Sequence, residues 1–169
     1  MQVVPLQHIR LRCVVPVLTL AVAYAVAAWL GSWLAIPPGY TTVIRPASGL
    51  ALAGVLIGCA RVAPGIWVGS FVVNLWTMWH VTQAVTLLTF VAIPSSIGVG
   101  ATLQALVGAA LVRRWVGFPN PLTRIRDIGT FLLLGGPLSC LISATVGVTT
   151  LAVSGQIPWS LFVMTWWTW

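Results

Sequence analysis

A series of long apolar runs constrains this chain more than any other feature. The runs cover about 13–36, 46–60, 62–79, 84–113, 127–153 and 158 onward, with short polar or proline-containing breaks between them. About 20 apolar residues at about 1.5 Å per residue cross the ~30 Å hydrocarbon core of a bilayer. Only 5% of the residues are charged, whereas about a quarter are charged in soluble domains. The pattern predicts an all-α fold, a polytopic transmembrane helix bundle with about six spans.

The last apolar run, from Pro158 to Trp169, is too short for a full span. We therefore expect the sixth helix to be incomplete, as in a fragment or a truncated product. The remaining runs leave no room for a second unit. Residues 1–169 are predicted to form a single integral membrane domain without an output domain.

The arginines predict how the bundle is oriented. The chain has eight arginines, no lysine and one acidic residue, Asp127. If the runs alternate across the membrane, seven arginines fall on one side: Arg10, Arg12, Arg61, Arg113, Arg114, Arg124 and Arg126. Only Arg45 falls on the other side. Because cytoplasmic loops carry an excess of arginine and lysine, both termini are predicted to be cytoplasmic, in a multi-pass protein of the bacterial inner membrane.

Two runs are longer than one straight span. The run 84–113 contains Pro94, and the run 127–153 contains Gly135, Gly136 and Pro137. Proline removes an intrahelical hydrogen-bond donor and clashes with the preceding turn. We expect a bend, or an interfacial segment before the span, near Pro94, and a similar interruption near Pro137.

Small residues recur at every fourth position within several runs, as in Gly54 and Gly58 or Gly65 and Gly69. Such stripes let helix backbones approach closely in lipid, where no hydrophobic effect drives association. Packing inside the bundle is the interpretation we favour, and a homodimer is the alternative.

Blocks from Pro37 to the C-terminus resemble a known family. They are IPPGYTTVIRPASGLALAGVLIG, RVAPGIWVGSFVVNLW, GATLQALVGAALVRRW, PLTRIRDIGTFLLLGG, LISATVGVTTLAVSG and WWTW. In this order they resemble the first class of bacterial membrane-associated sensor (MASE) domains, the membrane inputs of many histidine kinases and diguanylate cyclases. The chain departs from that pattern at three positions: Arg45 stands where a tryptophan is common, and Ala101 and Gln104 stand where asparagine and glutamate are frequent.

Polar groups inside the spans are the candidates for ligand binding or signal relay, because an unpaired polar group in lipid is unfavourable. Asn74, Gln104 and Ser139 have similar predicted depths, and with Ser143 they could form a central pocket. The alternative is a set of interhelical hydrogen bonds of about 1 kcal/mol each. Arg45 precedes Pro46 at a predicted helix N-terminus, an unfavourable place for a cation. It either reaches a lipid phosphate or captures an external anion.

Catalysis is not expected from this inventory. Two histidines and one aspartate supply no carboxylate pair, no activated nucleophile and no metal cluster. Asp127, near the start of the fifth run, is instead expected to cap a helix. We expect no enzymatic activity, metal or cofactor in this chain, and no nucleic-acid partner, since its arginines are explained by orientation in the membrane.

The resemblance implies a sensory input module of a bacterial signalling protein, such as one arm of a two-component system. It would bind a small or membrane-borne signal and relay it to a cytosolic output domain that this chain lacks. Its expected partners are the lipid bilayer and that cytosolic domain. The alternative is the membrane substrate-binding component of a small-solute transporter, since about six spans with Pro and Gly breaks also suit transport.

Overall fold

The computed structural model describes residues 6–33, 45–81, 86–120 and 122–169, with the backbone alone for residues 6–13 and Val81. All regular elements in these ranges are helical. They are α1 (Leu6–Ser32), α2 (Pro46–Gly58), α3 (Ala63–Val81), α4 (Leu87–Trp115), α5 (Ile125–Leu133), α6 (Ser139–Val153) and α7 (Phe162–Thr168), with 3₁₀ turns at Cys59–Val62 and Trp159–Leu161. The predicted all-helical fold class is confirmed.

Four helical stretches in the described residues are long and apolar enough to cross a membrane. They are Val14–Ser32, Pro46–His80, Leu87–Trp115 and Ile125–Val153. The second stretch reverses at Cys59, whose positive φ of 58° ends α2, so α2 and α3 are separate helices. With α7 as a short sixth segment, the arrangement is compatible with the predicted count of about six spans. Two parts of the predicted runs lie outside the described residues: the end of the first run, 34–36, and the start of the fourth, 84–85.

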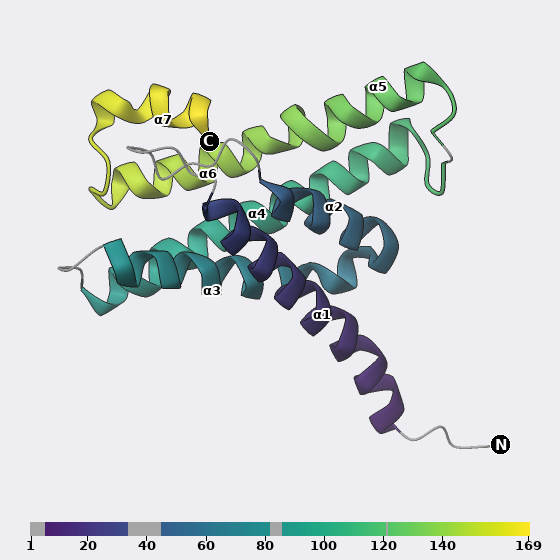
Figure 1. Ribbon diagram of the computed structural model, residues 1–169, viewed down its shortest axis with the longest axis horizontal. Coiled ribbons are helices and arrows are strands. Elements are labelled where there is room, and N and C mark those ends of the chain that lie inside the picture. Colours follow the sequence, from purple (N-terminus) through teal and green to yellow (C-terminus); the bar gives the residue numbers. More distant parts are fainter. Residues whose placement is uncertain (1–5, 34–44, 82–85, 121) are drawn as a thin grey trace.

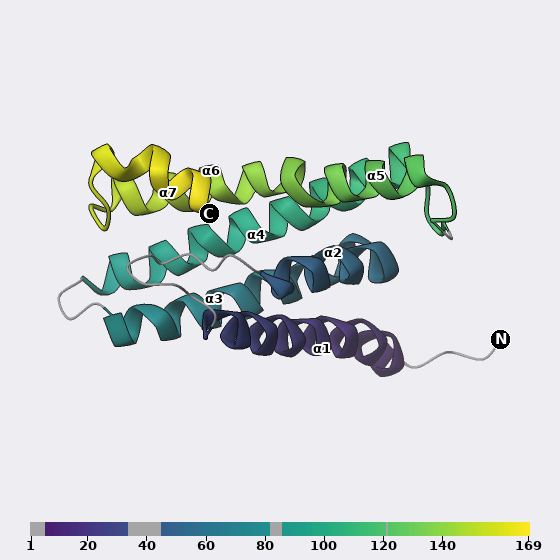
Figure 2. The same ribbon diagram turned by 45° about the horizontal axis from the view of Figure 1, so that its top comes forward.

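The helices pack in a continuous series in which α1 contacts α2 and α3, α4 contacts α2, α3 and α6, and α7 contacts α6. Figure 2 shows α5, α6 and α7 along one side of the bundle and α1 along the other. The turn between α2 and α3 and the connection between α4 and α5 lie at the same end (Figure 1). This end carries Arg61, Arg113, Arg114, Arg124 and Arg126 and is called the arginine-rich end below.

The stripe of Gly65 and Gly69 on α3 packs directly against the backbone of α1. A Cβ atom at Gly65 would collide with the carbonyl oxygen of Val17, and one at Gly69 would lie 2.6 Å from that of Ala21. Only glycine allows two helices to approach this closely. This stripe therefore serves packing inside the bundle, as the sequence predicted.

The two long runs behave differently. The second one is interrupted as predicted: a π-helical turn at Leu134–Leu138 separates α5 from α6, and Gly136 has non-helical angles (φ −97°, ψ −107°). In the first, α4 continues unbroken through Pro94, which is buried. A bend within α4 stays a prediction.

Asp127 lies in the first turn of α5, where a negative charge complements the helix dipole. The residue in the N-cap position is Arg124, and no side chain caps the helix. The carboxylate of Asp127 instead accepts a hydrogen bond of 3.4 Å from the amide of Asn120. The prediction of a capping hydrogen bond is therefore wrong, because the loop before α5 supplies its own donor.

Candidate functional site

Helix α2 is too short to cross the membrane. Its 13 residues make it about 20 Å long, roughly two thirds of the ~30 Å hydrocarbon core. The helix ends at the arginine-rich end and begins near the middle of the bundle's length, close to the C-terminal residue (Figure 1). Arg45, the N-cap residue of α2, therefore lies within the length of the bundle and not at one of its ends.

Arg113 of α4 fixes the far end of α2. Its guanidinium donates hydrogen bonds of 2.9 Å to the carbonyl oxygens of Val55 and Leu56 and lies 3.7 Å from the sulfur of Cys59. The last carbonyl groups of a helix have no intrahelical partners, and a cation near them also complements the helix dipole. Arg113 thus satisfies the C-terminus of α2.

Arg45 stands at the opposite end of α2, immediately before Pro46, and no side chain caps this end. Its guanidinium carbon lies 4.4 Å from the centre of the Trp169 ring, in a cation–π contact. Tyr24 of α1 and Cys140 of α6 also lie near this guanidinium. Segments that are far apart in the sequence therefore converge on one arginine.

Trp169 connects this arginine to α6. A Cβ atom at Gly147 would collide with the Trp169 ring, so the ring lies directly against α6 at this glycine. The indole N–H of Trp169 is buried and has no acceptor among the described residues. A second contact joins the same helices, since Nε1 of Trp166 donates to Oγ1 of Thr145 at 3.2 Å. Helix α7 is thereby anchored along α6.

Gln104 lies beside this cluster. It is buried, and its amide nitrogen lies 3.2 Å from the sulfur of Cys140. A Cβ atom at Gly100 would lie 3.0 Å from Cβ of Val146, and one at Gly108 would lie 3.2 Å from Cβ of Ser139, both in α6. The side of α4 that carries Gln104 therefore faces α6, at a place where the two helices approach closely.

The structure brings only some of the predicted site residues together. Gln104, Ser139 and Ser143 share the interface between α4 and α6, although the two serine hydroxyls donate to carbonyl oxygens of their own segment. Asn74 donates to the carbonyl and hydroxyl oxygens of Ser70, within its own helix. No described hydrogen bond joins Asn74 to Gln104. A role for these residues in ligand binding or relay stays a prediction.

Sequence reasoning placed Arg45 at the membrane surface and did not find its surroundings. The sequence did not indicate that Arg45 would lie near Tyr24, Cys140 and Trp169, because a sequence does not show which helices are neighbours. One signal was present: the apolar run that begins after Arg45 covers only about 46–60. A run too short to span would have indicated a buried start.

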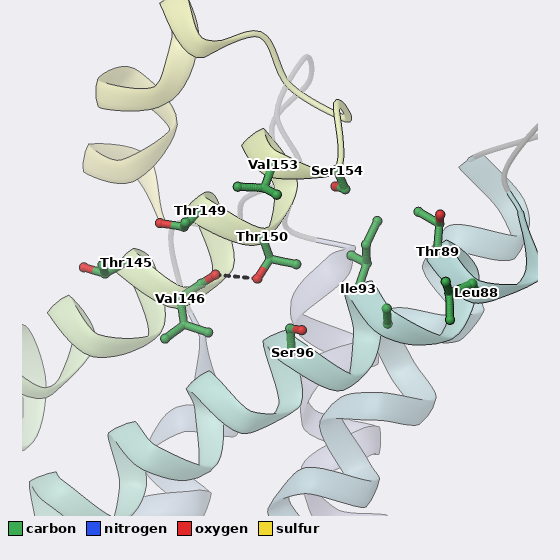
Figure 3. A pocket seen from close by; sticks show the side chains of 11 residues that line it. Leu88, Thr89, Ile93, Ser96, Thr145, Val146, Thr149, Thr150, Val153 and Ser154 are labelled. Atoms are coloured by element: carbon green, nitrogen blue, oxygen red, sulfur yellow. Dashed lines mark hydrogen bonds between the residues drawn. The ribbon is translucent and has the colours of Figure 1, made fainter.

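An open groove of about 630 Å³ lies between the first turns of α4 and the last turns of α6. Figure 3 shows Ile93 and Ser96 on one wall and Thr145, Thr150 and Val153 on the other. The hydroxyls of Thr145 and Thr150 donate to carbonyl oxygens of α6 itself, 2.7 Å away. The groove therefore offers mainly apolar walls.

The described residues contain no group of three or more His, Cys, Asp or Glu side chains able to hold a metal ion. Together, the apolar helices and the arginine-rich end define a polytopic helical protein of the membrane. The sequence profile of the MASE1 family matches residues 16–169, so the chain belongs to this family. MASE1 is a membrane sensory domain of signalling proteins, which confirms the resemblance found in the sequence. The chain matches no curated protein and no solved structure.

Proposed function

We propose that this chain is the input domain of a histidine kinase or a diguanylate cyclase and relays a signal to a cytosolic output domain. The observation that carries the proposal is the position of Trp169, between Arg45 and the α6 backbone at Gly147. Helix α7 starts at the end of the bundle opposite to the arginine-rich end and runs back toward the middle (Figure 1). A change around Arg45 would thus reach a helix directed toward the arginine-rich end.

The interface between α4 and α6 is suited to such a change. Gly100 and Gly108 bring the two helices close together, and the π-helical turn at Leu134–Leu138 separates α6 from α5. Close packing makes small displacements discrete rather than gradual, because an interdigitated interface has few alternative arrangements. The π-helical turn would let α6 move relative to α5. A bound signal would therefore alter how α6 and α7 sit on α4.

The relay can be tested in a fusion of the chain, through Trp169, to a diguanylate cyclase domain. Trp169→Ala removes the ring between Arg45 and α6, and we expect it to change the cellular level of cyclic di-GMP. Trp167→Ala is the matched control, since Trp167 is 78% exposed. An unchanged level with Trp169→Ala, at equal amounts of fusion protein in the membrane, would contradict the relay.

The proposed function also requires the arginine-rich end to face the cytosol. A cysteine can be introduced at Thr123, which is exposed between α4 and α5, after Cys13, Cys59 and Cys140 have been replaced by alanine. We expect no labelling of intact cells by a membrane-impermeant maleimide, and labelling once the membrane is broken. Labelling of intact cells would reverse the orientation.

A further inference from the structure

Two helical stretches of this protein are longer than the hydrocarbon core of a bilayer. The stretches Leu87–Trp115 and Ile125–Val153 each have 29 residues, so each is about 43 Å long. The hydrocarbon core is ~30 Å thick, whereas a bilayer with its headgroup regions measures about 40–45 Å. Both stretches run along the length of the bundle (Figure 2). Their connection at the arginine-rich end therefore reaches the level of the lipid headgroups.

Three exposed arginines flank this connection. Arg114 lies in the last turn of α4, Arg124 is the N-cap residue of α5, and Arg126 lies in the first turn of α5. Among the described residues, hydrogen bonds engage the guanidinium of the neighbouring Arg113 but none of these three guanidinium groups. The fold thus uses Arg113 to hold α2 and leaves the other three side chains directed outward.

Asn120 fixes the shape of the connection. Its amide nitrogen donates to the carbonyl oxygen of Val116 at 2.8 Å and to the carboxylate of Asp127 at 3.4 Å. Its side-chain oxygen accepts a hydrogen bond of 2.8 Å from the backbone N–H of Leu122. One side chain thereby joins the end of α4 to the first turn of α5, so Arg114 is held at the same end as the two arginines of α5.

Exposed apolar side chains lie among these charges. Trp115 is 68% exposed, Phe118 48% and Ile125 89%. Tryptophan is enriched at the boundary between headgroups and acyl chains, because its ring has both an apolar body and a polar tip. Arginine also suits this boundary, since its stem lies along apolar chains while its guanidinium reaches the phosphates. This mixture fits the surface of a bilayer better than bulk water.

We propose that Arg114, Arg124 and Arg126, together with Trp115 and Phe118, form a binding surface for anionic phospholipids in the leaflet that the arginine-rich end faces. A guanidinium binds a phosphate through charge-assisted hydrogen bonds. Each arginine near an anionic lipid surface contributes about a fivefold gain in affinity. The surface is separate from the contact between Arg45 and Trp169, and the proposal does not depend on the proposed sensory function.

Binding can be measured on the purified chain in a neutral detergent, without any output domain. Phosphatidylglycerol with a fluorophore on one acyl chain is titrated with the protein, and its anisotropy gives the Kd. Unlabelled phosphatidylglycerol should displace the probe at least about tenfold more effectively than phosphatidylcholine, whose choline group balances the phosphate charge. Raising the salt from about 0.1 to about 1 M should weaken binding, because the Debye length falls from ~10 to ~3 Å.

Variants make the result specific to this surface. Arg114→Gln should raise the Kd for phosphatidylglycerol about fivefold, and its combination with Arg124→Gln and Arg126→Gln should raise the Kd more than about fiftyfold. Arg61→Gln is the matched control, since it removes one exposed charge from the same end but in the turn between α2 and α3. It should change the Kd less than about twofold. An equal Tm of the variants without phosphatidylglycerol shows that the fold is retained.

Three results would overturn the proposal. The first is displacement of the probe by phosphatidylcholine as effectively as by phosphatidylglycerol. The second is a loss of affinity with Arg61→Gln as large as that with Arg114→Gln, which would assign binding to net charge alone. The third is displacement by soluble glycerol 3-phosphate at the same concentrations as by the lipid. None of them bears on the fusion test with Trp169→Ala, so failure of one proposal leaves the other in place.

Discussion

An arginine lies at each end of α2, one of them supplied by α4, and the surroundings of the two are opposite. Arg113 lies at the C-terminus, where two carbonyl oxygens accept its hydrogen bonds. Arg45 lies at the N-terminus, where its described partner is the ring of Trp169 and the helix dipole opposes it. The same residue type thus meets helix carbonyl oxygens at one end of α2 and an aromatic ring at the other.

This difference separates a structural role from a functional one. Charges inside membrane bundles are expensive, so those that persist mark either a fold-stabilising contact or a site of function. Arg113 fits the first description, since its partners are helix carbonyl groups. Arg45 fits the second, since it contacts Trp169, which follows the helix α7 that we propose carries the signal.

The largest expected effect is that of Arg113→Gln. The substitution removes charge-assisted hydrogen bonds to Val55 and Leu56, and we expect the free energy of unfolding to fall by about 2 kcal/mol. Unfolding in detergent micelles measures this. Arg114→Gln, at a neighbour on the same helix whose side chain has no described hydrogen bond, should change it by less than about 0.5 kcal/mol. Equal effects of the two variants would show that Arg113 contributes only surface charge.

A smaller effect of opposite sign is expected for Arg45→Gln. Removal of this charge, which the helix dipole opposes, should raise the free energy of unfolding by about 1 kcal/mol, after the loss of the cation–π contact. The same unfolding assay gives the value. A loss of stability similar to that of Arg113→Gln would show that the fold itself compensates Arg45, and the comparison would fail.

The contact between Arg45 and Trp169 should appear as a coupling of about 0.5 to 1 kcal/mol in a double-mutant cycle with Arg45→Gln and Trp169→Leu. The cation–π interaction exists only when both residues are present. A parallel cycle with Trp167→Leu should give a coupling near zero, because Trp167 is exposed. Additive effects of Arg45 and Trp169 would mean that their proximity has no energetic consequence.

The smallest effect is expected for Gln104→Leu, which keeps the side-chain volume but removes the contact with Cys140. Interhelical hydrogen bonds in membranes average about 0.6 kcal/mol, and we expect a loss of that size or less. In the cyclase fusion the output should stay close to that of the parent. An output locked in one state, with stability retained, would instead assign Gln104 to the relay.

The predicted fold followed from features that are local in the sequence. Apolar length gives the spans, and the Gly135, Gly136 and Pro137 sequence gives the interruption between α5 and α6. The prediction near Pro94 was less informative, since the α4 helix continues through a buried proline. One proline removes a single hydrogen bond, and packing around the helix can hold the remaining turns in place.

The candidate site was only half predictable. The stripe of Gln104 with its neighbouring glycines indicated a face that contacts another helix, and α6 occupies that face. Equal depth also suggested that Asn74 belongs to the same place, but its amide donates within α3. Depth along a helix follows from residue count, whereas direction around the axis depends on which helices are neighbours.

By itself, the sequence determined that this chain forms a helical bundle in a membrane, and that seven of its eight arginines fall on one side if the apolar runs alternate across the bilayer. These follow from composition and run length, which tertiary contacts cannot change. The tertiary structure alone decided that Arg45 lies at mid-bundle depth and that Trp169, 124 residues further along the chain, lies against it. Such contacts depend on how helices pack side by side, and interhelical packing in lipid is set by shape at many positions rather than by any local pattern.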